Sequence, residues 1–194
     1  MTSRPFRLML FVALLSFGTL ARAHSAARAD APSTGTPSDA QKSFDQLKAL
    51  AGTWEGPVTV DPPQPDIKSG AMLQLSLRVT SRGNALVHEM QAAGTPLDPA
   101  KYDHPVTIFY LDDEHLTLVH YCDAGNRPRM VARKSADGKT VEFDFVDLSG
   151  GNNYGHMHHA VFTFIDANHH MEDWTYMMPG DKPMHAHFDL TRSK

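Results

Sequence analysis

Histidines are the residues of this chain whose number and spacing best suit chemistry, since there are 12 among 194 residues. Three groups stand out: His156-Met157-His158-His159, His185-Ala186-His187 and His120-Tyr121-Cys122. In a β-strand, residues i and i+2 share a face, so a His-x-His pair presents two imidazoles side by side. Completed by a third histidine or a carboxylate from a neighbouring strand, such a pair could bind Zn, Fe or Cu.

Alternation along the strands indicates which histidines can face a common interior. His156 and His158 share their row with alanine and phenylalanine side chains, and His120 shares its row with leucines. His185 and His187 instead alternate with the apolar row of the last strand, so we expect them to point to solvent. The candidate metal ligands are therefore His120, His156 and His158, with hydrogen-bonded core histidines as the alternative.

A hairpin turn over residues 123–126 is the second candidate site, because Tyr121 precedes it and Arg129 follows it. Arg129 could reach into a barrel mouth as a fixed cation for a carboxylate or another anion. The alternative is an ordinary turn with a solvated arginine. The residues predicted to line a ligand pocket are His120, Tyr121, Arg129, His158, Glu172 and Trp174.

The elements that must position these residues begin with a short helix. Phe44, Leu47 and Leu50 recur at helical spacing, and Ser43 or Asp39 can cap the N-terminus. Strand-like segments alone follow. They are predicted at 54–60, 70–80, 84–91, 105–111, 115–122, 129–135, 140–146, 156–165, 170–178 and 183–192.

Most of these segments alternate apolar and polar residues, which is typical of an antiparallel sheet with one buried face. The connections are short and hairpin-like, which favours a barrel over a sandwich. The predicted fold is all-β: an antiparallel up-and-down β-barrel of eight to ten strands. The helix closes one end, and Trp54 on the first strand closes the bottom of the core.

The helix, the segment Gly52-Thr53-Trp54-Glu55-Gly56 and a meander ending in Phe188-Asp189-Leu190-Thr191-Arg192 resemble lipocalin-like, calycin-type β-barrels. The resemblance is greatest to uncharacterised secreted bacterial proteins of that type. It implies a closed barrel with an inner pocket and does not identify a ligand.

A weaker resemblance is to nitrobindin, a haem-binding barrel that also opens with Gly-x-Trp-x-Gly and carries its haem ligand in a His-x-x-x-x-Leu-x-Arg pattern. His185, Leu190 and Arg192 fit that spacing, so the resemblance implies His185 as a haem ligand. Pro57 departs from the glycine-rich continuation of that family, and His185 alternates out of phase with the apolar row.

The N-terminus has the pattern of a signal peptide over residues 1–23, with Arg4 and Arg7 before an apolar run and Ala21-Arg22-Ala23 as a cleavage site. Ala27-Arg28-Ala29 is a second candidate cleavage site. Residues 24–41 are predicted to be a flexible linker and 42–194 the barrel domain. We therefore expect a periplasmic or secreted protein without stable membrane insertion after cleavage. Residues 24–194 hold 15 basic and 22 acidic residues, a net charge of −7, which argues against nucleic acid as a partner.

Enzyme motifs are absent: the sequence has no Walker loop, Rossmann glycine pattern, Gly-x-Ser-x-Gly or His-Glu-x-x-His. Its only cysteine, Cys122, is interpreted as a buried, inert thiol. The sequence therefore favours a barrel that binds a small, mostly apolar molecule with a polar or anionic group, and no cofactor is expected. The alternatives are a His-ligated metal enzyme using Zn or Cu, a haem-binding barrel, and a filled structural barrel without a ligand.

Overall fold

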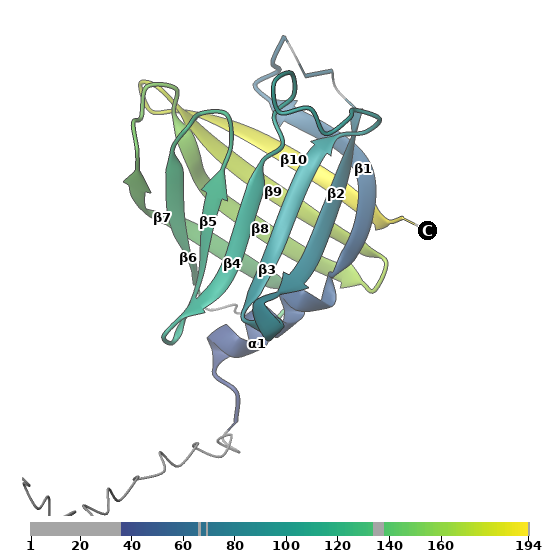
Figure 1. Cartoon of the computed structure of the whole chain (residues 1–194), viewed down its shortest axis with the longest axis vertical. Coiled ribbons are helices and arrows are strands. Elements are labelled where there is room, and N and C mark those ends of the chain that lie inside the picture. Colours follow the sequence, from purple (N-terminus) through teal and green to yellow (C-terminus); the bar gives the residue numbers. More distant parts are fainter. Residues whose placement is uncertain (1–35, 66, 69, 134–137, 194) are drawn as a thin grey trace, which may run out of the picture. The chain divides into compact units, whose positions relative to one another are not determined.

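The computed structural model describes residues 36–65, 67–68, 70–133 and 138–193. These residues form one α-helix, one 3-10 turn (η1, Ser81–Gly83) and ten antiparallel strands that close into a barrel (Figure 1). The predicted fold class is therefore confirmed. The predicted signal peptide, residues 1–23, and most of the predicted linker lie outside the described residues.

Helix α1 (Asp39–Ala49) begins inside the stretch predicted to be linker. Its N-cap is Ser38, whose hydroxyl accepts a hydrogen bond from the Gln41 backbone N–H at 3.1 Å. The predicted caps, Asp39 and Ser43, were wrong, because Asp39 is the first residue of the helix and Ser43 is buried within it. Figure 1 shows the helix at one end of the barrel. Its Phe44 and Leu47 side chains are buried. None of the described helices is long and apolar enough to cross a membrane.

The strands follow the predicted order closely, and the largest difference is that β7 runs three residues further than expected. Their bounds are β1 (Gly52–Asp61), β2 (Ala71–Thr80), β3 (Ala85–Ala92), β4 (Val106–Asp112), β5 (His115–Tyr121), β6 (Arg127–Arg133), β7 (Thr140–Ser149), β8 (His156–Asp166), β9 (His169–Met178) and β10 (Lys182–Arg192). Each strand pairs with its neighbours in the chain, and β1 pairs with β10 to close the barrel. Closure leaves no unpaired sheet edge.

The Gly-Thr-Trp-Glu-Gly segment explains how β1 fits against β10. A Cβ on Gly56 would lie 1.8 Å from the backbone oxygen of Asp189, so only glycine permits this approach. Trp54 is fully buried and its Nε1 donates to the backbone oxygen of Leu50 at 2.8 Å, which joins the end of the helix to the first strand. The guanidinium of Arg192 lies 4.2 Å from the centre of the Trp54 ring.

The barrel interior is largely filled by side chains from the inward rows of the strands. Buried phenylalanines from β4, β7 and β8 pack edge-on or tilted against one another, with ring centroids 5.4–6.0 Å apart. These are Phe109, Phe143 and Phe162. The residues that interrupt this apolar packing are therefore the candidates for function.

Candidate functional site

A carboxylate lies at the centre of a hydrogen-bonded cluster in the barrel core. Glu172 on β9 is fully buried. Its Oε1 accepts hydrogen bonds from His170 Nε2 at 3.0 Å and from His88 Nε2 at 3.2 Å. Its Oε2 accepts from Trp174 Nε1 at 2.9 Å and from His88 Nε2 at 3.0 Å. We call Glu172, His88, His170 and Trp174 the core cluster.

Two parts of the barrel supply the core cluster. His170, Glu172 and Trp174 occupy alternate positions of β9, so all three face inward. His88 comes from β3, which is not a hydrogen-bonded neighbour of β9. Among the described side chains, Nδ1 of His88 and Nδ1 of His170 are buried without a partner. The cluster therefore links opposite parts of the barrel through its interior.

Charge on Glu172 is strongly favoured despite its burial. Burial alone would raise the pKa of Glu172, but attraction to His88 and the hydrogen bonds from His170 and His88 outweigh it, so the pKa lies well below its ordinary value. A buried carboxylate with several donors is costly to disturb, because its partners lose their acceptor together.

His120 lies beside the core cluster as a second buried histidine. Its Nδ1 is 2.8 Å from Thr107 Oγ1 on the adjacent strand β4, and its ring centroid is 5.6 Å from that of Trp174. Burial, reinforced by repulsion from His88, lowers the pKa of His120 to about 3. Its Nε2 is among the buried described atoms without a partner. His120 is therefore a neutral imidazole at neutral pH.

This low pKa predicts an acid-sensitive fold. Unfolded His120 takes up a proton near pH 6.5 whereas folded His120 does not, so stability is complete above pH 6.5 and falls as the pH drops toward about 3. Replacing His120 by glutamine should reduce the slope of unfolding free energy between pH 6 and 4 by about 1.4 kcal/mol per pH unit. Denaturant titrations at several pH values measure this slope. Thr107→Val, which keeps the imidazole, should retain it, and equal slopes in His120→Gln and wild type would contradict the assignment.

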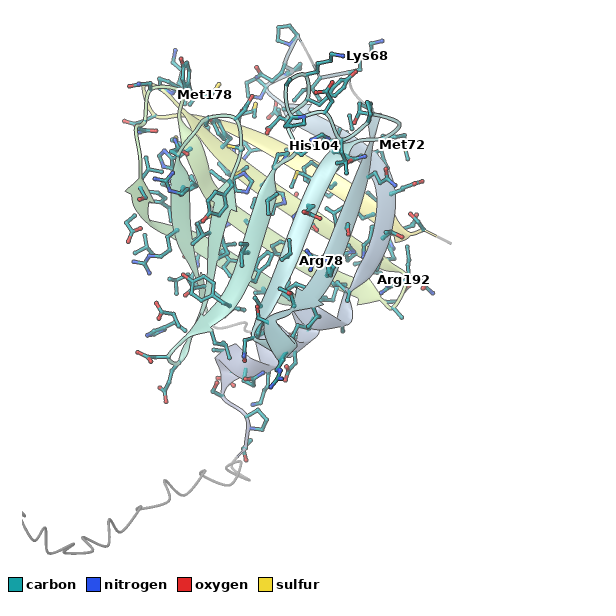
Figure 2. All side chains as sticks on the ribbon, in the orientation of Figure 1. Lys68, Met72, Arg78, His104, Met178 and Arg192 are labelled. Carbon is teal, nitrogen blue, oxygen red and sulfur yellow. The ribbon has the colours of Figure 1, made fainter. Side chains whose placement is uncertain are left out.

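An apolar cavity of about 440 Å³ opens at the end of the barrel opposite α1. Most of its wall comes from inward side chains of β1, β2, β3 and β10, with residues of the β1–β2 and β3–β4 connections at the rim. The apolar wall includes Val58, Leu73, Met90, Ala186 and Phe188. The charged residues at the cavity are Lys68 and Asp103. Lys68 and Met72 both lie at this end of the barrel in Figure 2.

The cavity adjoins the core cluster without exposing it. Met90 lies two residues from His88 on the same face of β3, and Phe188 is opposite Glu172 in the β9–β10 register. Both Met90 and Phe188 are buried wall residues, so a molecule in the cavity would contact apolar side chains. Burial, and then the nearby Asp123, raise the pKa of Asp103 at the rim.

A histidine pair lies at the start of β8. His156 Nε2 is 3.2 Å from His158 Nδ1, and His156 Nδ1 is 3.1 Å from Asn152 Oδ1. The ring of Phe145 packs against both, with centroids 4.5 Å from His156 and 5.1 Å from His158. The β8–β9 register shifts between Met157 and His159, so the pair lies at an irregularity of the sheet.

The structure brings together only part of the predicted ligand pocket. His120, Glu172 and Trp174 meet in the core, as described above. Tyr121 is 42% exposed, and Arg129 lies outside, where its Nε donates to Asp147 Oδ2 at 3.0 Å. His158 belongs to the histidine pair. None of the six predicted residues is in the wall of the apolar cavity.

Arg129 faces outward for a local reason. Pairing between β6 and β7 shifts register between Arg129 and Met130, and the inward position belongs to Met130, which is fully buried. The cation therefore pairs with Asp147 on the outer surface.

The predicted metal trio is also separated. His120 is bonded to Thr107 in the core, whereas His156 and His158 pair with each other. Within the described residues, the only group of three close metal-ligand atoms is Glu142, Asp144 and His159, on β7 and β8. Arg133 pairs with both carboxylates of that group.

The histidine implied by the haem resemblance lies on the outside of the barrel. His185 is exposed, and its Nδ1 is 3.1 Å from Thr175 Oγ1. His187 Nδ1 lies 2.7 Å from Asp173 Oδ1. The lone cysteine, Cys122, is half-buried, and burial raises the pKa of its thiol, which opposes a nucleophilic role.

Sequence reasoning missed His88 and His170. His88 occupies an inward position in an otherwise apolar row, Leu86-x-His88-x-Met90, and His170 shares its inward row with Glu172 and Trp174. The alternation that predicts the strands also predicts that these two histidines point inward. Neither of them belongs to a His-x-His pair.

Comparison with known proteins adds no closer assignment. No protein-family model matches the chain, and no curated protein matches it. The closed antiparallel barrel is consistent with a calycin-like fold.

Proposed function

We propose that this protein binds a small, mostly apolar molecule with an anionic or polar group in the cavity at the open end of the barrel. The supporting observation is an apolar cavity of about 440 Å³ in a barrel that is otherwise packed with side chains. Ligand sites of this type are concave, mostly apolar and oriented by a few polar groups. Together with the predicted signal peptide, this suggests a carrier or receptor that acts in the periplasm or outside the cell.

The rim supplies two chemically different orienting groups. Lys68 is an exposed cation that can pair with a carboxylate or sulfonate. Burial, and then the nearby Asp123, raise the pKa of the Asp103 carboxyl, and its oxygens can accept a hydrogen bond from a polar group of a ligand. An amphiphile with an apolar tail among Val58, Leu73 and Phe188 and its head at the rim would satisfy both regions.

Filling the cavity should abolish binding. We expect anilinonaphthalene sulfonate, an apolar probe with one anionic group, to fluoresce on binding and to be displaced by decanoate. Ala186→Trp places an indole in the cavity and should weaken the binding of both ligands by at least about tenfold, or about 1.4 kcal/mol. The matched control is His185→Trp, which introduces the same indole one residue away on the outer face. It should leave both affinities unchanged.

Decanol separates the apolar contribution from the ionic one. Lys68→Ala should weaken the binding of decanoate by roughly fivefold, as expected for loss of a solvent-exposed ion pair. It should leave the binding of decanol unchanged. Unaltered probe binding by Ala186→Trp, with an unchanged thermal unfolding midpoint, would contradict the proposal. Absence of any saturable binding by the wild-type chain would favour the filled structural barrel.

A further inference from the structure

We propose that His156 and His158 chelate a divalent transition-metal ion, Cu²⁺ or Zn²⁺, at the start of β8. The proposal concerns the histidine pair alone and is independent of the apolar cavity. It rests on the separation of two ring nitrogens, on the group that orients one of them, and on the packing that holds both rings.

The nitrogen separation matches the bite of a tetrahedral metal centre. Two imidazole nitrogens, each about 2.0–2.1 Å from zinc, lie roughly 3.3 Å apart across a tetrahedral angle. His156 Nε2 and His158 Nδ1 are already 3.2 Å apart. The observed separation of the two nitrogens therefore agrees with the expected one to within about 0.2 Å. The rings need only turn so that both lone pairs point at the ion.

Asn152 orients the first ligand. Its side-chain Oδ1 accepts a hydrogen bond from His156 Nδ1 at 3.1 Å, which assigns the proton to Nδ1 and leaves a lone pair on Nε2. A carbonyl or carboxylate on the second ring nitrogen is the usual outer partner of metal-bound histidine.

The second ligand needs only a change of tautomer. Without metal, the N–H at His158 Nδ1 donates a hydrogen bond to His156 Nε2. On metal binding this proton moves to His158 Nε2 through solvent, so both ligand nitrogens present lone pairs and no net proton is released. Phe145 stacks on His158 with the ring planes 20° apart and holds it in place.

The ligand set indicates which ions would bind. Two imidazoles suit Cu²⁺ and Zn²⁺, and affinity is highest for Cu²⁺ in the first-row series. Because the histidine pair is not part of any three-ligand group among the described residues, water would complete the coordination. A site of this kind remains open to an exogenous ligand.

The test is a titration of the purified chain with CuCl₂ and ZnCl₂, followed by calorimetry and, for Cu²⁺, by electron paramagnetic resonance. We expect one site, with a copper spectrum showing coupling to two nitrogens. His158→Ala and His156→Ala should each weaken binding at least about tenfold, and Asn152→Ala by about tenfold, the usual effect of losing an outer partner. His158→Gln provides a second variant if the alanine substitution disturbs folding.

Two controls locate the ion. His187→Ala alters the other His-x-His pair, whose side chains are bonded to Asp173 and Thr175, and should leave binding unchanged. His159→Ala alters the Glu142, Asp144 and His159 group and should also leave it unchanged. Binding that survives loss of His158 but not of His159 or His187, or a copper spectrum without two nitrogen ligands, would overturn the proposal, as would absence of one-site binding to the wild type.

Discussion

Replacing Glu172 by glutamine should lower the free energy of unfolding by about 3–5 kcal/mol, the cost of removing one partner from a buried charged network. The carboxylate accepts hydrogen bonds from His88, His170 and Trp174 with both oxygens. Glutamine keeps the shape but offers one oxygen, and its amide group presents N–H to a neighbouring donor. Two donors then face each other in the buried core, which is costly.

Guanidinium-induced unfolding at pH 7 measures the effect, and Glu89→Gln is its matched control. Glu89 is an exposed glutamate on β3, next to His88, and its substitution should change stability by less than about 0.5 kcal/mol. A loss of less than about 1 kcal/mol in Glu172→Gln would show that the core cluster does not stabilise the fold.

The same variant should alter acid unfolding in a defined direction. Because the pKa of Glu172 lies below its ordinary value of 4.5, its contribution is complete above pH 4.5 and is lost as the pH falls further. Glutamine cannot titrate, so this loss should be absent from Glu172→Gln. The window lies below most of the one expected for His120, and the two effects are therefore separable.

Trp54→Ala should destabilise the barrel by about 3–5 kcal/mol through the cavity it leaves. The indole is fully buried, lies edge-on to His170 with centroids 4.3 Å apart, and bonds the helix end through Leu50. The substitution thus removes packing between α1 and β1 and leaves a backbone oxygen without its donor. Denaturant midpoints measure the loss.

Tyr154→Ala is the control for Trp54→Ala, since that ring is 71% exposed and its removal should cost less than about 0.5 kcal/mol. A change below about 1 kcal/mol in Trp54→Ala would contradict the closed-end assignment. Because Trp54 contacts His170, its effect and that of Glu172→Gln should not add in the double variant.

The fold was predictable because local pattern and tertiary environment agree. In Leu73, Leu75 and Leu77, the apolar row is also the row that faces the interior. The start of α1 was not predictable in detail, since Ser38, Asp39 and Ser43 are all competent caps. The structure shows Ser38 as the cap, with Ser43 buried beside Phe44 and Leu47.

The site was less predictable because strands distant in the sequence build it. Glu172 and Trp174 were recognised as inward residues, but nothing in the local pattern of β3 indicates that His88 reaches Glu172 across the interior. The sequence left open whether Arg129 reaches the barrel mouth or is solvated, and its outer partner, Asp147, lies beyond the predicted end of β7. The apolar cavity depends on how far opposite walls stand apart, which periodicity does not encode.

Because β1 pairs with β10, the barrel can close only after β10 has been synthesised. A nascent chain presents the free edge of β1 early, but the strand that covers it is the last to be made. Until then, the open meander resembles a sheet ready to recruit a strand from another molecule. A chain truncated before Lys182 lacks β10 and would keep two such edges permanently, so this truncation should promote aggregation or strand exchange.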